Sequence, residues 1–230
     1  MKLLVSDYDG TLNRNYKNLC LNIKAINKFR EEGNKFVIAT GRSFESIKKE
    51  TDIYGIEYDY LICNGGLIIF DNENNILKCS LLNSETLTNL YQLLANLCYV
   101  EKIKLYNFYG STIDMENILE MYVKFNTVDE ALLNKKYIEY IMPEILCYQE
   151  GNRLYIGNKI TKADAISFIK EKELINPKKI YTVGDNKNDL EMLGRYNGYR
   201  MLFSNSSLWG KKIPVTRDVH TLIKKINYKR

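Results

Sequence analysis

The sequence predicts an α/β fold built on a Rossmann-like parallel sheet, and three observations carry this prediction. Short apolar runs such as Leu3-Leu4-Val5 and Phe36-Val37-Ile38-Ala39 alternate with segments of helical periodicity at both ends of the chain. Each run ends in polar or glycine residues, as buried strands do at the edge of a sheet. The chain has 230 residues, of which 45% are hydrophobic, enough to bury the core of one or two domains.

The first part of the chain alternates strand and helix. The pattern predicts a strand at 2–6 and a helix over about 18–32, which Gly33 closes. Buried crossover units of this kind favour parallel pairing with right-handed connections. The next expected elements are a strand at 35–39, a helix from Ser43, a strand at 60–63, and a hairpin formed by strands at 67–70 and 76–80.

The middle of the chain is less regular than its ends. A helix is expected where Leu87, Leu90, Leu94 and Leu97 share one face, and residues 100–152 indicate strands and a helix whose order stays open. Clean alternation resumes at 153. The expected elements are a strand at 153–157, a helix at 162–172, a strand at 179–183, a helix at 187–194, a strand at 199–203 and a last helix at 218–227.

The most informative segment is Asp7-Tyr8-Asp9-Gly10-Thr11, directly after the first strand. Two carboxylates two residues apart would point to opposite faces of a strand, but Gly10 permits a tight turn that lets both face one cavity. One carboxylate can then attack an electrophile while the other transfers protons, and a divalent cation can offset their repulsion. An ordinary solvated loop after a strand is the structural alternative.

Three further segments supply matching chemistry. Thr40-Gly41 ends the second strand, where a hydroxyl and backbone N–H groups suit an anionic oxygen, although a strand cap has the same pattern. Lys162 opens a helix with a capping-box pattern and is otherwise a surface charge. The segment 184–189 clusters Asp185, Asn188 and Asp189, and oxygen ligands of this kind suit Mg²⁺. Ligands bind at the carboxyl ends of such strands, so we expect these segments to meet at one rim.

In this order and spacing, the four segments resemble the haloacid dehalogenase (HAD)-like phosphohydrolase superfamily. Asn64-Gly65-Gly66 and Pro214-Val215-Thr216 are similar to the Cof-like, sugar-phosphatase branch, which carries an α/β (C2B-type) cap. The resemblance implies a Rossmann-like HAD core formed by residues 1–78 and 153–230. It implies an inserted α+β cap domain over residues 79–152, which sets substrate choice. Tyr106, Tyr109 and Tyr122 are its candidates for stacking on a sugar.

The resemblance also implies an activity and residue roles. It implies a Mg²⁺-dependent phosphatase of small phosphorylated metabolites, sugar phosphates among them, acting through an aspartyl-phosphate. A phosphomutase or phosphotransferase with the same nucleophile, and a non-catalytic phospho-binding regulatory protein, remain alternatives. The implied roles are Asp7 as nucleophile and Asp9 as general acid and base; Thr40, Gly41 and Lys162 as phosphate ligands; Asp7, Asp9 and Asp185 as Mg²⁺ ligands; and Asn188 and Asp189 as supports or further ligands.

Composition limits the partners. No run of eighteen apolar residues suggests a membrane span, and the start of the chain lacks the pattern of a signal peptide. Five Cys without a Cys-x-x-Cys motif indicate reduced thiols, so we expect a cytoplasmic enzyme. The net charge of +5 suits a small-molecule phosphate ester, and nothing indicates the oligomeric state. Short basic clusters are typical of solvated faces rather than a nucleic-acid-binding stripe: Lys135-Lys136, Lys178-Lys179, Lys211-Lys212, Lys224-Lys225 and Lys229-Arg230.

Overall fold

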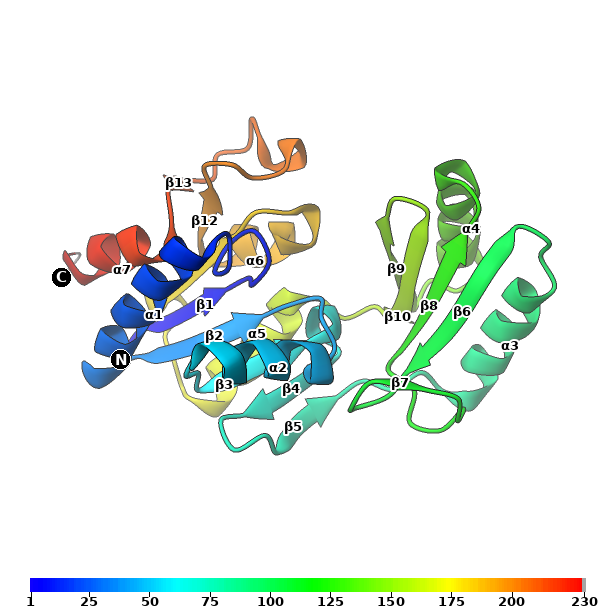
Figure 1. The fold of residues 1–230 in the computed structure, drawn as a ribbon, viewed down its shortest axis with the longest axis horizontal. Coiled ribbons are helices and arrows are strands. Elements are labelled where there is room, and N and C mark those ends of the chain that lie inside the picture. The colour runs from blue at the N-terminus through cyan, green and yellow to red at the C-terminus, as the bar shows by residue number, and fades with distance from the viewer. Residues whose placement is uncertain (229–230) are drawn as a thin grey trace.

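A computed structural model describes residues 1–228, which form two β-sheets, each covered by helices (Figure 1). The terminal basic pair Lys229-Arg230 lies outside the described residues. Among residues 1–228, no helix combines the length and the apolar character needed to cross a membrane.

The larger sheet has eight strands in the order β13-β12-β11-β1-β2-β3-β4-β5. The strands from β13 to β3 run parallel, while β4 and β5 are antiparallel additions at the edge. Strands from the two ends of the chain therefore lie side by side at its centre, as β1 and β11 do (Figure 1). The strands are β1 Leu3–Ser6, β2 Lys35–Ala39, β3 Tyr60–Cys63, β4 Ile68–Asp71, β5 Ile76–Cys79, β11 Ile180–Gly184, β12 Asn197–Met201 and β13 Val215–Thr216.

Helices cover both faces of this sheet. On one face, Leu19 of α1, Ile47 of α2 and Leu222 of α7 share a buried cluster with alternate strand residues. On the other face, Ile166 of α5 and Met192 of α6 do the same. The helices are α1 Tyr16–Glu31, α2 Phe44–Tyr54, α5 Lys162–Lys172, α6 Leu190–Arg195 and α7 Val219–Tyr228, with 3₁₀ turns at Asn64–Gly66, Pro177–Lys179, Lys187–Asp189 and Ser206–Leu208.

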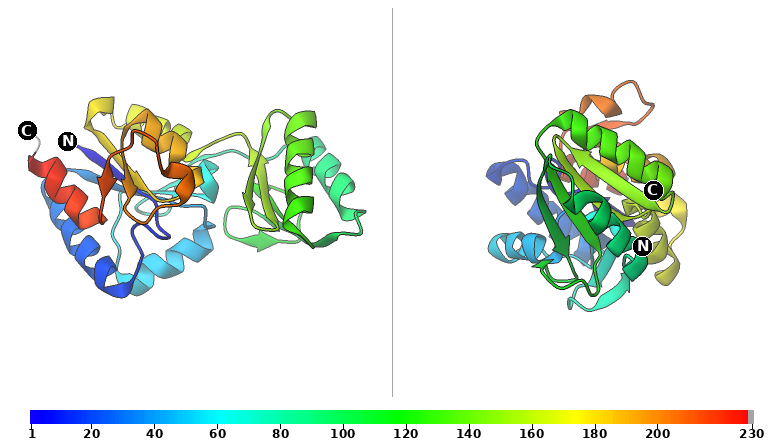
Figure 2. Two further views of the ribbon diagram at one scale, coloured as in Figure 1. Left: turned by 90° about the horizontal axis from the view of Figure 1, so that it is seen from above. Right: turned by 90° about the vertical axis from the view of Figure 1, so that its right-hand side faces the viewer.

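The smaller sheet has five antiparallel strands in the order β7-β6-β8-β10-β9. Helices α3 and α4 pack on one face of it, where Leu90 and Ile138 join Val123, Phe125 and Leu154 in a third buried cluster. These helices lie on the side turned away from the larger sheet (Figure 2). The elements are α3 Ser84–Ala95, β6 Val100–Tyr106, β7 Ser111–Thr112, β8 Glu120–Phe125, α4 Val128–Ile141, β9 Ile145–Glu150 and β10 Arg153–Asn158.

The α/β fold with a parallel sheet is confirmed, with one strand in a different sheet from the one expected. The strand at 153–157 was assigned to the core, but β10 pairs with β8 and β9 in the smaller sheet. Its apolar residues Leu154 and Ile156 pack against that sheet's own helices, and alternation alone does not reveal which partner a strand takes. The division of the chain into a core and an inserted cap domain stays a prediction.

Smaller differences concern element ends. The helix expected at 187–194 is a 3₁₀ turn followed by α6, and the strand expected at 199–203 lies at Asn197–Met201. The helix expected from residue 18 begins at Tyr16, where the Asn15 side chain accepts a hydrogen bond from the Asn18 N–H. Such N-cap bonds, rather than the apolar pattern, fix where a helix begins.

Candidate active site

The parallel strands β1 and β11 bring two acidic loops to the same edge of the larger sheet. The Asp7 N–H donates to the Val183 carbonyl at 2.9 Å, which extends the pairing past the end of β1. Gly10 then lies at φ +77°, and a Cβ there would stand 2.5 Å from Asp185 Oδ2. Both the backbone conformation and the close approach therefore require glycine at this turn.

Lys162, at the start of α5, lies between two of these carboxylates. Its Nζ donates to Asp7 Oδ1 at 2.6 Å and to Asp189 Oδ1 at 2.7 Å, and its side chain is 1% exposed. The capping box expected at this helix start is present, because Asp164 accepts a hydrogen bond from the Thr161 N–H at 3.0 Å. The lysine is thus a buried charge with two partners, and the alternative of a surface charge is wrong.

Asp189 and Thr11 hold Asp185 in place. Asp189 Oδ2 accepts from the backbone N–H groups of Asp185 at 2.9 Å and Asn186 at 3.0 Å, while its Oδ1 binds Lys162. The Thr11 hydroxyl donates to Asp185 Oδ1 at 2.7 Å. Both oxygens of Asp189 are therefore engaged within the protein, whereas Asp185 keeps one oxygen beside Gly10.

Three carboxylates crowd this point. Oxygens of Asp7, Asp185 and Asp189 lie within 4.8 Å of one another, so the group could hold a metal ion. Burial raises the pKa of Asp7 well above its ordinary value, against the opposing effect of Lys162. Burial also raises the pKa of Asp185. For Lys162, burial lowers the pKa, but Asp189 and Asp7 outweigh it and raise it overall. One ammonium thus faces three carboxylates, a donor set that fits a hard divalent cation.

The neighbouring strand β2 adds an anion-binding turn. Thr40 is 1% exposed, and its hydroxyl oxygen accepts from the Arg42 N–H at 3.1 Å, which leaves its proton free to donate. Asn188 faces this turn from the acidic loop, with Nδ2 3.9 Å from a Cβ placed on Gly41. The Asn188 Oδ1 atom is buried with no hydrogen-bond partner within residues 1–228. A polar atom orphaned in this way is costly unless a ligand satisfies it.

Asp9 does not join the acidic cluster. Its carboxylate makes a two-point ion pair with Arg42, through Nε at 2.8 Å and Nη2 at 2.7 Å, and its side chain is 57% exposed. The same guanidinium also contacts Glu50 and lies over the Tyr8 ring. Sequence reasoning assigned no role to Arg42, although its position after Thr40-Gly41 placed it at the rim.

Two side-chain hydrogen bonds, donated by Asn64 and Asn186, join the smaller sheet to the loops at this edge, and sequence reasoning identified neither. Asn64 Nδ2 donates to Glu120 Oε2 at 3.2 Å, at the start of β8. Asn186 Nδ2 donates to the Tyr148 hydroxyl of β9 at 3.4 Å. Burial raises the pKa of Glu120 to about 7, against the opposing hydrogen bond from Asn64. A lone glutamate in an apolar strand was the only sequence signal for this contact.

A family model for haloacid dehalogenase-like hydrolases matches residues 4–139 and 99–208 of the chain. The chain belongs to this family. The matched segments include the loops that carry Asp7, Thr40, Lys162 and Asp185, and the resemblance to the haloacid dehalogenase-like family is confirmed.

Similar proteins agree with this assignment. The hydrolase is 23% identical to a phosphoglycolate phosphatase of Methanobrevibacter smithii, over 90% of this chain and 87% of that one. It shares its fold with a haloacid dehalogenase-like hydrolase from B. subtilis, at a TM-score of 0.84 and 15% identity over 97% and 99% of the two chains. It also matches a HAD subclass IIB sugar phosphatase, at a TM-score of 0.78 and 17% identity over 100% and 99%. The resemblance to that branch is confirmed at the level of fold.

The hydrolase therefore brings together most of the residues singled out from its sequence. Asp7, Lys162, Asp185 and Asp189 are in mutual contact or close to it. Thr40, Gly41 and Asn188 form an adjacent turn. The Asp9 carboxylate belongs to neither group, because Arg42 holds it.

Proposed function

We propose that this hydrolase is a Mg²⁺-dependent phosphatase of small phosphorylated metabolites that acts through an aspartyl-phosphate on Asp7. The observation that carries the proposal is the buried contact of Asp7 with Lys162, next to Asp185 and Asp189. A carboxylate held in one orientation beside a fixed positive charge suits attack on an anionic phosphoryl group. The phosphatase name of one relative and the sugar-phosphatase name of another agree with this reaction.

Asp7 and Asp185 are the ligands we assign to the cation. Each keeps an oxygen outside its hydrogen bonds with Lys162 and Thr11, whereas both Asp189 oxygens are occupied. We assign the backbone carbonyl of Asp9 as a further ligand. The cation supplies positive charge that lowers the raised pKa values of these carboxyls and keeps Asp7 ionised for attack.

The remaining residues hold the phosphoryl oxygens. The Thr40 hydroxyl and the Gly41 N–H lie at the end of β2, beside the loop that follows β1, so both can donate to a phosphate placed on Asp7. Lys162 neutralises part of the same charge. Asn188 Nδ2 lies near this turn and can donate a hydrogen bond there. Its Oδ1 has no hydrogen-bond partner within residues 1–228, so a bound ligand can supply one.

Proton transfer falls to Asp9. In this role Asp9 protonates the leaving oxygen and later takes a proton from the water that releases phosphate. Its ion pair with Arg42 must break or turn for this, because both Asp9 carboxylate oxygens accept hydrogen bonds from Arg42. In this proposal Arg42 is a positioning residue, which holds the Asp9 side chain by an ion pair in the absence of substrate.

The test is a panel of phosphate esters incubated with purified protein, with Mg²⁺ and with a chelator. We expect release of inorganic phosphate only when Mg²⁺ is present. After rapid quenching, we expect Asp7 to carry the added mass of one phosphoryl group. Analysis of organic products in excess sugar distinguishes hydrolysis from phosphotransfer, because transfer would give a new phosphate ester instead of inorganic phosphate. No turnover of any ester with Mg²⁺ would contradict the proposal.

A further inference from the structure

The segment between β12 and β13 carries large apolar side chains in solvent. It spans residues 202–214 and projects from the larger unit as the orange loop of Figures 1 and 2. Leu202, Phe203 and Trp209 are 49%, 65% and 60% exposed. Leu208 of the same segment is buried in the core, so the segment is anchored without these three side chains. Exposed apolar groups gathered on one short segment are typical of an interaction surface.

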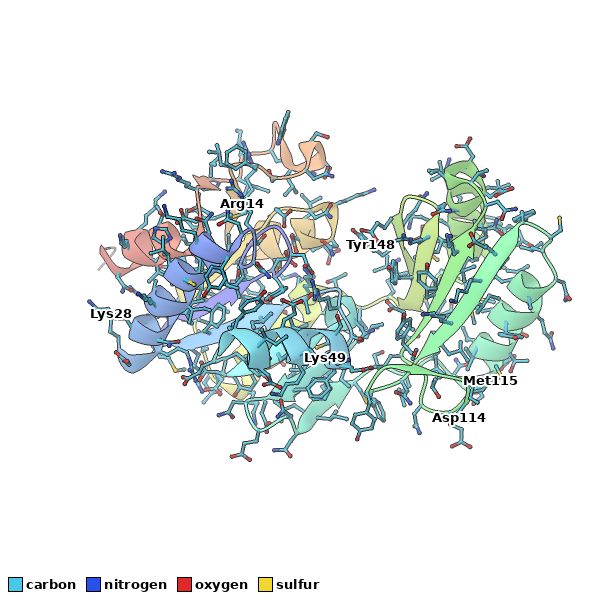
Figure 3. All side chains as sticks on the ribbon, in the orientation of Figure 1. Arg14, Lys28, Lys49, Asp114, Met115 and Tyr148 are labelled. Atoms are coloured by element: carbon cyan, nitrogen blue, oxygen red, sulfur yellow. The ribbon has the colours of Figure 1, made fainter. Side chains whose placement is uncertain are left out.

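The two exposed aromatic rings of this segment are held in place. The Trp209 indole N–H donates to the Ser204 carbonyl at 3.0 Å, which places the indole beside the residue that follows Phe203. The Arg14 guanidinium lies over the Phe203 ring, 4.3 Å from its centroid. In Figure 3, Arg14 lies in the upper part of the larger unit, next to this segment. Each ring is therefore fixed on one side and still mostly open to solvent.

The same end of the chain is strongly basic, although the rest is not. Residues 196–230 contain eight Lys and Arg and a single acidic residue, Asp218, whereas the rest of the chain contains 25 Lys and Arg and 27 Asp and Glu. Among the described residues of this end, only His220 has a carboxylate partner, which is Asp218. Lys211 and Lys212 lie in the 202–214 segment itself and are exposed. Their charges are therefore free to attract an anionic partner.

The elements on either side of the segment add further cations. β13 is the last strand of the larger sheet, and Arg217 follows it directly and is exposed. Lys225 of α7 lies over the Tyr199 ring of β12, 5.0 Å from the centroid. Arg14 adds a cation beside Phe203. Cations thus border the exposed apolar side chains, and a partner that suits this surface is both anionic and apolar.

We propose that the 202–214 segment docks on the surface of a membrane that contains anionic lipids. Tryptophan and other large apolar side chains are stabilised in the interfacial region of a bilayer, and lysines beside them are attracted to anionic head groups. The inference gives this hydrolase a binding partner that its proposed catalytic function does not require, and binding can be measured without any substrate.

A single nucleic-acid strand is the competing polyanion, and three observations favour the lipid surface. Stacking of a base needs an open ring face, but Arg14 occupies one face of Phe203. The Trp209 N–H is already bonded to Ser204, so it is not available to a phosphate or a base. Leu202 gives a base no aromatic face to stack on, whereas a bilayer accepts it.

Docking at this segment would hold the catalytic edge beside the bilayer. The Asn205 N–H donates to the Asp185 carbonyl at 2.7 Å, which ties the segment to the acidic loop. The Leu202 N–H donates to the Thr216 carbonyl at 2.9 Å, which ties its beginning to β13. These backbone bonds fix the segment at the edge where β1 and β11 end, so a lipid surface in contact with Phe203 also lies near the candidate active site.

Trp209 is the only tryptophan of the chain, so its fluorescence reports on this segment alone. The probes are vesicles of phosphatidylcholine and vesicles with about one third phosphatidylglycerol. We expect co-sedimentation with the anionic vesicles only, a shift of Trp209 emission to shorter wavelength, and quenching by lipids with brominated acyl chains. Raising the salt from about 0.1 M to about 1 M should weaken binding, because the Debye length falls from about 10 Å to about 3 Å.

Phe203→Ser tests the apolar contribution to binding. Its matched control is Tyr140→Ser, an exposed aromatic residue on α4 of the smaller unit. We expect the partition coefficient for anionic vesicles to fall about tenfold in Phe203→Ser, because the ring no longer leaves water on docking. The Tyr140→Ser control should bind as the wild type does.

A double variant, Lys211→Gln with Lys212→Gln, tests the contribution of charge. Its matched control is Lys178→Gln with Lys179→Gln, two exposed lysines that precede β11. We expect the first pair to weaken binding to anionic vesicles by at least about tenfold and the control pair by less than about twofold. Equal losses for the two pairs would show attraction by net charge alone and would contradict docking at this segment.

The remaining outcomes also decide the proposal. No sedimentation with anionic vesicles, or sedimentation with an unchanged Trp209 spectrum, would overturn it. A Trp209 signal that responds to single-stranded RNA and not to vesicles would assign the surface to nucleic acid instead. Circular dichroism and the urea midpoint establish that each variant is folded. Should Phe203→Ser fail to fold, the Lys211→Gln, Lys212→Gln variant decides by itself, and wild-type binding by that variant would reject the proposal.

Discussion

The two surfaces that face each other at the candidate active site differ in how their polar groups are engaged. On the larger unit, Asp7, Lys162 and Asp189 are at most 9% exposed and hold one another by short ionic hydrogen bonds. On the smaller unit, Tyr122, Tyr155 and Lys104 are partly exposed and make few polar contacts. Groups engaged in this way have one arrangement and suit a step common to every substrate, whereas free groups can select among substrates.

The largest expected effect concerns the buried, ion-paired surface of the larger unit that carries Asp7. Asp7→Asn removes the attacking carboxylate but keeps its size, so we expect turnover to fall by at least about 10³-fold with the fold preserved. Asp52→Asn, an exposed carboxylate on α2, is the matched control and should keep full activity. The measurement is kcat on the best ester, with mass spectrometry to exclude deamidation of the new Asn. Retention of more than a few per cent of activity would contradict a covalent role for Asp7.

Metal removal should have a similarly large effect and bears on the same surface. After exhaustive chelation we expect phosphate release to fall to background and to return with Mg²⁺. Ca²⁺ should restore little, because it takes more oxygens at longer distances and would engage the Asp7 oxygens that must attack. The measurement is initial rate against free cation concentration. Full activity in the chelated protein would exclude the metal role of Asp7 and Asp185.

The Lys162→Met variant tests whether ion pairs hold Asp7 and Asp189 in place on the larger unit. The variant leaves Asp7 and Asp189 buried beside each other without their shared cation, so we expect a loss of about 3 kcal/mol in the free energy of unfolding. Activity should fall on all esters together, because Lys162 contacts only the part of the site common to them. Urea unfolding and kcat/KM on two unrelated esters measure this. A change confined to one ester would break the distinction between the two surfaces.

A pH-dependent effect is expected at the contact of Glu120 with Asn64. The folded chain keeps the Glu120 proton up to about pH 7, whereas the unfolded chain releases it near 4.5. The favourable contribution is therefore complete below pH 4.5, shrinks as the pH rises and is gone above pH 7, a change of up to ~3 kcal/mol. Glu120→Gln should remove this part of the pH dependence of unfolding in urea. Glu116→Gln, an exposed neighbour, should leave it unchanged, and equal slopes in wild type and Glu120→Gln would refute the assignment.

Local patterns in the sequence were sufficient for the loops of the larger unit. Asp7, Thr40 and Asp185 each follow an apolar run, and parallel strands end at one edge, so their convergence followed from topology alone. The capping box at Thr161 and Asp164 was likewise visible, because a cap is satisfied within four residues.

The sequence by itself determined the α/β alternation, the four loops and the residues that they carry, since each depends on neighbours along the chain. The tertiary structure alone decided that β10 joins the smaller sheet, that Lys162 lies between Asp7 and Asp189, and that Arg42 holds Asp9. It also aligned Tyr148, Tyr155 and Tyr122 in one row. The physical reason is that periodicity fixes which face of a strand or helix is buried, while the partner of a strand or a charge depends on which distant segment packs against it.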